Sequence, residues 1–150
     1  MPTPLLPPTD AALVDPRTGH VTRAWYPKFQ FLDRAVRMSG LGYTPGAGGT
    51  VTQATSKATG VTLNKATGQV TLNNAALASD TTVSFTLTDA AIEAGDLLVL
   101  NHVSGGTAGA YLLNAQCAAG SASINVRNIT GGSLSETIVI GFALIKGRTA

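Results

Sequence analysis

The chain has 150 residues, which is room for one full domain and a modest extension. Its ten basic and eight acidic residues give a net charge of +2, too small to indicate binding to nucleic acid or to an anionic membrane. The single cysteine, Cys117, excludes an internal disulfide framework and a cysteine-clustered zinc site, and we expect it to be a small structural hydrophobe. Only 12% of the residues are charged, where about 25% is usual, so we expect an oligomer that hides apolar surface between its subunits.

The N-terminal residues 1–21 are rich in proline and end in the turn Asp15-Pro-Arg-Thr-Gly19, which predicts an extended arm. They show neither the basic region nor the apolar region of a signal peptide, so we expect a protein that is assembled in a cytoplasm. The sequence Asn128-Ile-Thr130 matches a glycosylation acceptor, which we do not expect to be used there. The longest apolar stretch, residues 138–145, is too short for a membrane span.

Residues 22–38 predict one amphipathic helix that begins near Tyr26, with Pro27 in its first turn. The residues on its apolar stripe, at spacings of four, three and four, are Trp25, Phe29, Leu32 and Val36. A lone helix of about a dozen residues is marginal, so this stripe must pack either on the chain's own β region or on a neighbouring protein. The Gly- and Pro-rich residues 41–49 read as a flexible linker, which favours the second alternative. The candidate docking residues are therefore Trp25, Tyr26, Phe29, Leu32 and Val36.

From Thr50 onward the apolar residues recur with period two, which is typical of strands. Residues 61–64 and 70–73 alternate apolar and polar, and the four residues Lys65-Ala-Thr-Gly68 between them predict a hairpin turn with Gly68 in a left-handed conformation. Residues 89–96 predict a short helical or turn segment.

Further strands are predicted at 83–87, 97–100, 111–113, 124–126 and 137–145. The run 97–100 is apolar throughout, which is typical of a strand covered on both faces. Residues 50–150 are therefore predicted to be an all-β domain, a jelly-roll-like antiparallel sandwich of seven to eight strands, preceded by the arm and helix of residues 1–40 and the linker of residues 41–49.

Two residue groups are candidates for catalysis. Asp89 and Glu93 are four apart, so they could form the carboxylate pair of a glycan hydrolase, but acids that cap a solvated turn give the same pattern. Ser104 lacks the Gly-x-Ser-x-Gly context of a nucleophile, and we expect His102 to be a strand-end histidine bonded to a loop backbone. His20 is the only other histidine, so we do not expect a metal site within one chain. A metal could still be bound by three copies of His102 around a threefold axis. We expect no enzyme activity and no cofactor.

Several stretches resemble a domain of bacteriophage structural proteins, tail-fibre and other appendage proteins among them. In the β region these are Gly48-Gly-Thr-Val-Thr-Gln53, Gly60-Val-Thr-Leu-Asn-Lys65, Gly68-Gln-Val-Thr-Leu-Asn73, Val83-Ser-Phe-Thr-Leu87, Asn101-His-Val-Ser-Gly-Gly-Thr-Ala-Gly-Ala-Tyr111 and Asn125-Val-Arg-Asn-Ile-Thr-Gly-Gly-Ser-Leu-Ser-Glu136. The opening, with Pro4-Leu-Leu, Asp15-Pro-Arg-Thr-Gly19 and Trp25-Tyr, is similar to the start of phage proteins that attach an appendage to the virion.

The resemblance implies a virion structural protein: a tail-fibre or appendage component that docks through its N-terminal segment and trimerises through its β domain. Its partners would be other virion proteins of the tail, the portal or adaptor, or the capsid. Tail fibres often have long shafts, for which this chain has no room, so an adaptor-like tail piece and a head decoration or head-fibre protein remain alternatives. A receptor- or carbohydrate-binding tip is a third, but it predicts exposed aromatic loops, and beyond the linker only Phe85, Tyr111 and Phe142 are aromatic, all in predicted strands.

Overall fold

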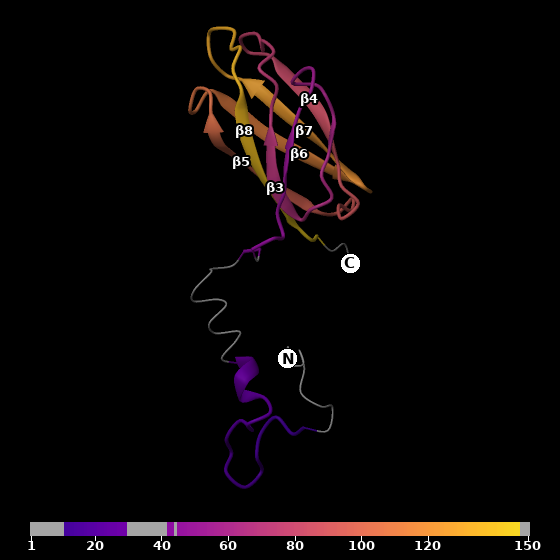
Figure 1. The fold of residues 1–150 in the computed structure, drawn as a ribbon, viewed down its shortest axis with the longest axis vertical. Coiled ribbons are helices and arrows are strands. Elements are labelled where there is room, and N and C mark those ends of the chain that lie inside the picture. Colours follow the sequence, from indigo (N-terminus) through magenta and orange to yellow (C-terminus); the bar gives the residue numbers. More distant parts are fainter. Residues whose placement is uncertain (1–10, 30–41, 44, 148–150) are drawn as a thin grey trace. The chain divides into compact units, whose positions relative to one another are not determined.

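The computed structural model describes residues 11–29, 42–43 and 45–147. The chain divides into two compact units, residues 1–42 and 43–150. The second unit confirms the all-β prediction, with eight strands in two four-stranded sheets (Figure 1). The strands are β1 (Thr50–Thr52), β2 (Val61–Thr62), β3 (Thr67–Thr71), β4 (Thr82–Thr88), β5 (Leu97–Gly105), β6 (Tyr111–Ala118), β7 (Ser121–Asn128) and β8 (Ile138–Ile145).

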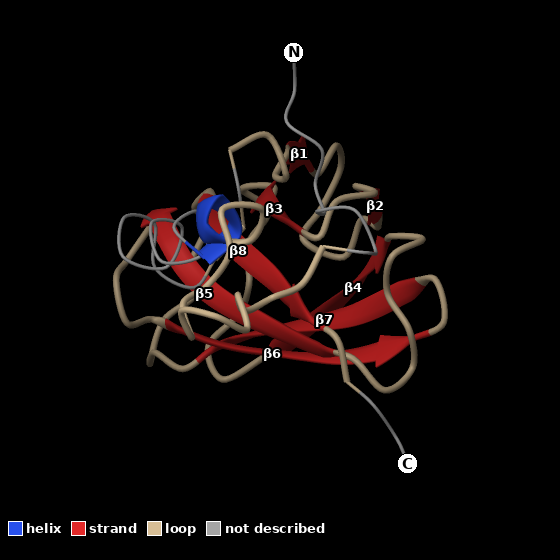
Figure 2. Cartoon of the chain, turned by 90° about the horizontal axis from the view of Figure 1, so that it is seen from below, coloured by secondary structure: helices blue, strands red, loops and turns tan. Residues whose placement is uncertain are grey.

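The two sheets have the strand orders β1-β3-β8-β5 and β2-β4-β7-β6 and form the two layers of a sandwich (Figure 2). The longer strands pair antiparallel: β3 and β5 with β8, and β4 and β6 with β7. The short strands β1 and β2 instead run parallel to their neighbours β3 and β4. The sandwich is thus mostly antiparallel, and its strand order does not by itself establish the jelly-roll connectivity.

The predicted hairpin between residues 61–64 and 70–73 is wrong. β2 pairs with β4 in one sheet, whereas β3 pairs with β1 and β8 in the other, so the chain crosses between the sheets at residues 63–66. Gly68 does not have the positive φ of the predicted left-handed conformation. Gly105 does have a positive φ, which is a common reason for a glycine at such a position. Gly68 is required for space instead, because a Cβ there would lie 2.7 Å from Cδ2 of Leu63.

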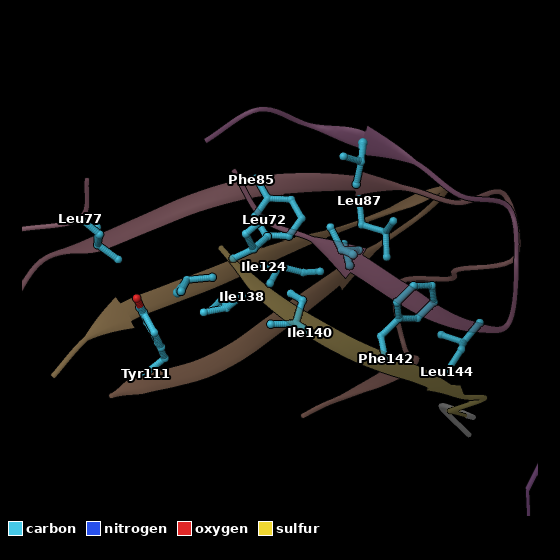
Figure 3. Packing of buried hydrophobic residues seen from close by; sticks show 14 of the residues in the cluster. Leu72, Leu77, Phe85, Leu87, Tyr111, Ile124, Ile138, Ile140, Phe142 and Leu144 are labelled. Carbon is cyan, nitrogen blue, oxygen red and sulfur yellow. The ribbon is translucent and has the colours of Figure 1, made fainter. Parts of the chain in front are cut away.

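The core lies between the sheets (Figure 3). Successive side chains of a strand point to opposite faces of its sheet, and the core consists of those that point inward. Its fully buried members lie mainly on β3, β4, β7 and β8 and the segments beside them; they include Val70, Leu72, Leu87, Ile124, Val126, Ile138 and Ile140. Full burial of one such side chain stabilises the fold by about 1.5–3 kcal/mol relative to exposure. On the edge strands β5 and β6 most inward side chains are only half-buried, for example Leu98, Leu100 and Leu113, whereas Tyr111 is buried. The sandwich is therefore least covered along β5 and β6.

The described part of the N-terminal unit is a closed turn followed by the start of a helix. Val14 and Val21 form an antiparallel bridge, and the amide of Gly19, which has a φ of 70°, donates to the Asp15 carbonyl. Residues 11–21 therefore fold back on themselves instead of forming an extended arm; residues 1–10 lie outside the described residues. Residues 26–29 are helical, so the helix begins at Tyr26 as predicted.

The predicted helical or turn segment 89–96 is a turn in the structure. Its last residue, Asp96, is buried and accepts hydrogen bonds from Nζ of Lys146 at 2.7 Å, the Gly147 amide at 3.0 Å and the Glu93 amide at 2.8 Å. This carboxylate ties the residues that follow β8 to the turn that precedes β5.

Candidate functional site

The outer faces of the two sheets differ in chemistry. The strands of the β1-β3-β8-β5 sheet contain no Asp, Glu, Lys or Arg, and the outward side chains of β5 and β8 are largely aliphatic. An antiparallel sheet with one solvated face normally alternates apolar and polar residues. The outer face of β5 and β8, which we call the β5–β8 face, departs from that rule.

Strand β5 supplies the most exposed apolar side chains of the β5–β8 face. Leu97, Val99 and Val103 are 63%, 52% and 46% exposed, and Ile145, the cross-strand partner of Leu97, is 52% exposed. We refer to Leu97, Val99 and Val103 as the β5 ridge. The sequence predicts cover on both faces of residues 97–100, and within the described sandwich the second sheet covers only the inner face.

Next to the β5 ridge, small residues leave an open groove of about 690 Å³. Gly141 of β8 lies in its lining, with Asn101 of β5 as its partner on one side and Gln69 of β3 on the other. Val103 sits at a β-bulge of β5, and its Cγ2 lies 2.9 Å from where a Cβ on Gly141 would be. A side chain at position 141 would therefore displace the ridge and fill the groove.

The outer face of the β2-β4-β7-β6 sheet is polar. The hydroxyl of Ser84 donates to Oδ1 of Asn125 at 2.6 Å, and Nδ2 of Asn125 donates to Oδ1 of Asn114 at 2.6 Å, so a hydrogen-bonded ladder crosses three strands. Arg127 pairs with Asp80 at 2.6 Å, and Leu112 is the one large apolar side chain among the outward residues described on β4, β6 and β7. The outward residues of this face are thus mainly polar, as is usual for the solvated face of an antiparallel sheet.

The structure describes three of the five predicted docking residues. Trp25 is half-buried, and its indole N–H donates to the Ala11 carbonyl at 2.9 Å, so it holds the N-terminal unit together. Tyr26 and Phe29 are 56% and 45% exposed. The other two, Leu32 and Val36, lie outside the described residues. Two large aromatic side chains are thus exposed among the described residues of the N-terminal unit.

The neighbourhood of His102 agrees with the structural role expected from the sequence. Its Nε2 lies 2.8 Å from the Gly105 carbonyl oxygen, and its ring meets that of Tyr111 edge to face at 5.9 Å. The Tyr111 hydroxyl donates to Glu136 at 2.9 Å, as do the amide and hydroxyl of Thr107. Desolvation raises the pKa of Tyr111, and the hydrogen bond from the Thr107 amide lowers the pKa of Glu136. The cluster closes the loop between β5 and β6 over the end of the core.

The pairing of Asp89 with Glu93 as catalytic carboxylates is wrong. Asp89 is fully buried and accepts a hydrogen bond from the Ala91 amide at 2.9 Å, whereas the side chain of Glu93 is 73% exposed and lies 3.5 Å from Lys146. The two carboxylates therefore have different surroundings, as expected for a turn. Across the part of the chain that the structure describes, no three His, Cys, Asp or Glu side chains gather as metal ligands would. Within the same ranges, no helix has the length and apolar character needed to cross a bilayer.

Two further predictions concern Asn128 and Cys117. Asn128 is fully buried and its amide donates to the carbonyls of Leu77, Ala78 and Gly132, so this acceptor sequence is closed to glycosylation in the folded chain. Cys117 is half-buried against the core, and burial raises the pKa of its thiol, which agrees with a structural role.

Comparison with known proteins gives no relative: no family model, curated protein or solved structure matches the chain.

The β5–β8 face was not predicted from the sequence. Its only signals there were the apolar run 97–100 and the glycine inside the run 138–145.

Proposed function

We propose that the chain is a bacteriophage virion structural protein, a tail-fibre or appendage component that docks through its N-terminal segment and trimerises through its β domain. The observation that carries the proposal is the exposure of Tyr26 and Phe29 on a small unit distinct from the sandwich. Large aromatic side chains are the usual energetic centres of protein interfaces. The resemblance of the N-terminal sequence to phage attachment segments supplies the kind of partner.

The low charge of the chain supports a role in assembly. Charged residues are depleted at the centres of interfaces, and the strands of one whole sheet carry none. The aromatic residues of the described strands, Phe85, Tyr111 and Phe142, are buried, so the sandwich does not offer them as platforms for a sugar. These features favour a protein that works through contacts with other virion proteins.

The experiment is incorporation of the chain into particles of the phage that encodes it, measured by quantitative mass spectrometry of purified virions. The test variant is Tyr26→Asp with Phe29→Asp, and the matched control is Leu112→Asp with Gln116→Asp, which places the same two charges at exposed positions of the polar face. Loss of an aromatic anchor costs about 2 kcal/mol or more, so we expect at least a tenfold lower copy number for the double variant and an unchanged one for the control. Absence of the wild-type chain from virions, or normal incorporation of the double variant, would overturn the proposal.

A further inference from the structure

We propose that the β5–β8 face is the surface through which copies of this chain assemble, with the β5 ridge of one copy seated in the groove beside Gly141 of the next. The inference rests on the proposed trimerisation and names the surface that performs it. Three features of the described sandwich carry it: an apolar edge strand without charge or proline, a ridge next to a groove of suitable chemistry, and the absence of charge.

The first feature is strand β5 itself. It is nine residues long and lies at the end of its sheet, where its only strand partner is β8. Natural proteins protect such edges with charged side chains, proline or β-bulges, because an exposed apolar edge invites pairing with other chains. β5 has a bulge at Val103 but no charged residue and no proline, and its apolar side chains face outward at Leu97, Val99 and Val103 as well as inward. This strand therefore has the composition of one that is covered on both faces, and within the described sandwich the second sheet covers one.

The second feature is the relation between the ridge and the groove. Val99 and Val103 of the β5 ridge form one wall of the groove, which extends over β8 and β3, where Gly141 and Ala143 leave space on the outer face. A ridge and a groove that lie side by side on one face cannot fill each other within a chain. The aliphatic ridge of a second copy matches the small and apolar residues that line most of the groove. Such a contact joins different parts of the two copies, so it repeats around a ring and closes with threefold symmetry in the proposed trimer.

The third feature decides which occupant covers the face. The four strands beneath it contain no charged residue, so a nucleic acid, an anionic membrane or an acidic peptide would find no counter-charge. An identical copy meets the face without like-charge repulsion and buries one apolar surface against another. The occupant that matches this chemistry is a second copy of the chain.

The test is sedimentation velocity of the full chain at micromolar concentration, with two variants that place a carboxylate on either side of the contact. Val99→Glu charges the ridge, and Gln69→Glu charges the groove with almost no change in shape at a residue that is exposed in the single chain. The control is Leu112→Glu, since Leu112 on the other sheet is 53% exposed and Val99 is 52% exposed. Circular dichroism verifies that each variant is folded; should Val99→Glu unfold, Gln69→Glu alone decides.

We expect a trimer for the wild type and for Leu112→Glu, and at least a tenfold weaker association for Val99→Glu and Gln69→Glu. A wild-type trimer that neither of these variants weakens overturns the assignment of this face while leaving the proposed function intact. Dissociation by Leu112→Glu alone places the interface on the other sheet and also overturns it. A wild type that is monomeric overturns the trimerisation itself, whereas docking to the virion is judged separately by the Tyr26 and Phe29 variants.

Discussion

Gly68 of β3 and Phe142 of β8 are cross-strand partners, and the Phe142 ring lies over the glycine. A Cβ on Gly68 would lie 3.0 Å from Cε1 of that ring, 2.7 Å from Cδ2 of Leu63 and 2.8 Å from the carbonyl oxygen of Gly49. The absence of a side chain at position 68 therefore lets the chain cross between the sheets while the Phe142 ring stays in the core. Glycine is needed here for close packing.

Gly68→Ala should destabilise the fold by about 1–3 kcal/mol, the usual cost of forcing extra atoms into a packed core. Gly131→Ala is the matched control, because nothing lies within 4 Å of its Cβ position and its φ is not positive. Urea unfolding at one fixed protein concentration measures both free energies of unfolding. A Gly68 variant as stable as the Gly131 variant would show that the neighbours of Gly68 can move to accept a methyl group without lowering the free energy of unfolding.

Asn128→Ala should also be strongly destabilising. The buried amide of Asn128 is the donor for three backbone carbonyls, and its oxygen accepts from the Thr130 amide at 2.9 Å. Leaving such groups without a partner costs about 1–3 kcal/mol, so the melting temperature should fall by several degrees. The control Asn74→Ala alters an exposed asparagine and should change stability by less than about 0.5 kcal/mol. Equal melting temperatures for the two variants would contradict this account of the loop.

Asp96→Ala should loosen the end of β8. The hydrogen bond from Lys146 holds the pKa of Asp96 below its ordinary value, and two amides, those of Glu93 and Gly147, donate to the same carboxylate. We expect faster hydrogen exchange at these two amides, with the centre of the core unchanged. Glu93→Ala, which removes only an exposed ion pair with Lys146, should leave exchange near the wild-type rate. Equally fast exchange in both variants would mean that the exposed ion pair between Glu93 and Lys146, and not the Asp96 carboxylate, holds the end of β8 in place.

The contribution of Glu136 to stability should depend on pH. Its pKa is lowered in the folded chain by the hydrogen bond from the Thr107 amide, so its stabilising effect is complete above the unfolded pKa, about 4.3, and is lost as the pH falls through the lower folded value. Glu136→Gln should therefore lower the melting temperature at pH 7, and the difference from the wild type should shrink as the pH falls below 4. A difference that stays constant with pH would mean that the charge of Glu136 is not what matters.

The sequence predicted the strands well because each depends on local alternation. Residues 83–87 and 124–126 fall inside β4 and β7, and their alternate side chains are buried as their pattern requires. The sequence did not predict correctly which strands pair. Residues 61–64 and 70–73 have the pattern of a hairpin, but two alternating segments joined by a short link can equally lie in opposite sheets, as they do here. Local pattern does not determine the partner.

The β5–β8 face could not be predicted because it is built by long-range pairing. Gly141 and Asn101 become neighbours only when β8 pairs with β5, and the bulge that places Val103 beside Gly141 leaves no signal in the sequence. The apolar run 97–100 did predict a strand that needs cover on both faces. What the run could not indicate is that the sandwich itself would cover only one of these faces.

The central claim, that this chain is a virion component assembled through the β5–β8 face, is tested most directly by cryo-electron microscopy of the intact particle. We expect density for three copies of the sandwich around a threefold axis, with the β5 ridge of each copy in the groove of its neighbour and the residues around Tyr26 and Phe29 seated in another virion protein. A particle without density for the sandwich, or with single copies whose β5–β8 face is open to solvent, would contradict the claim.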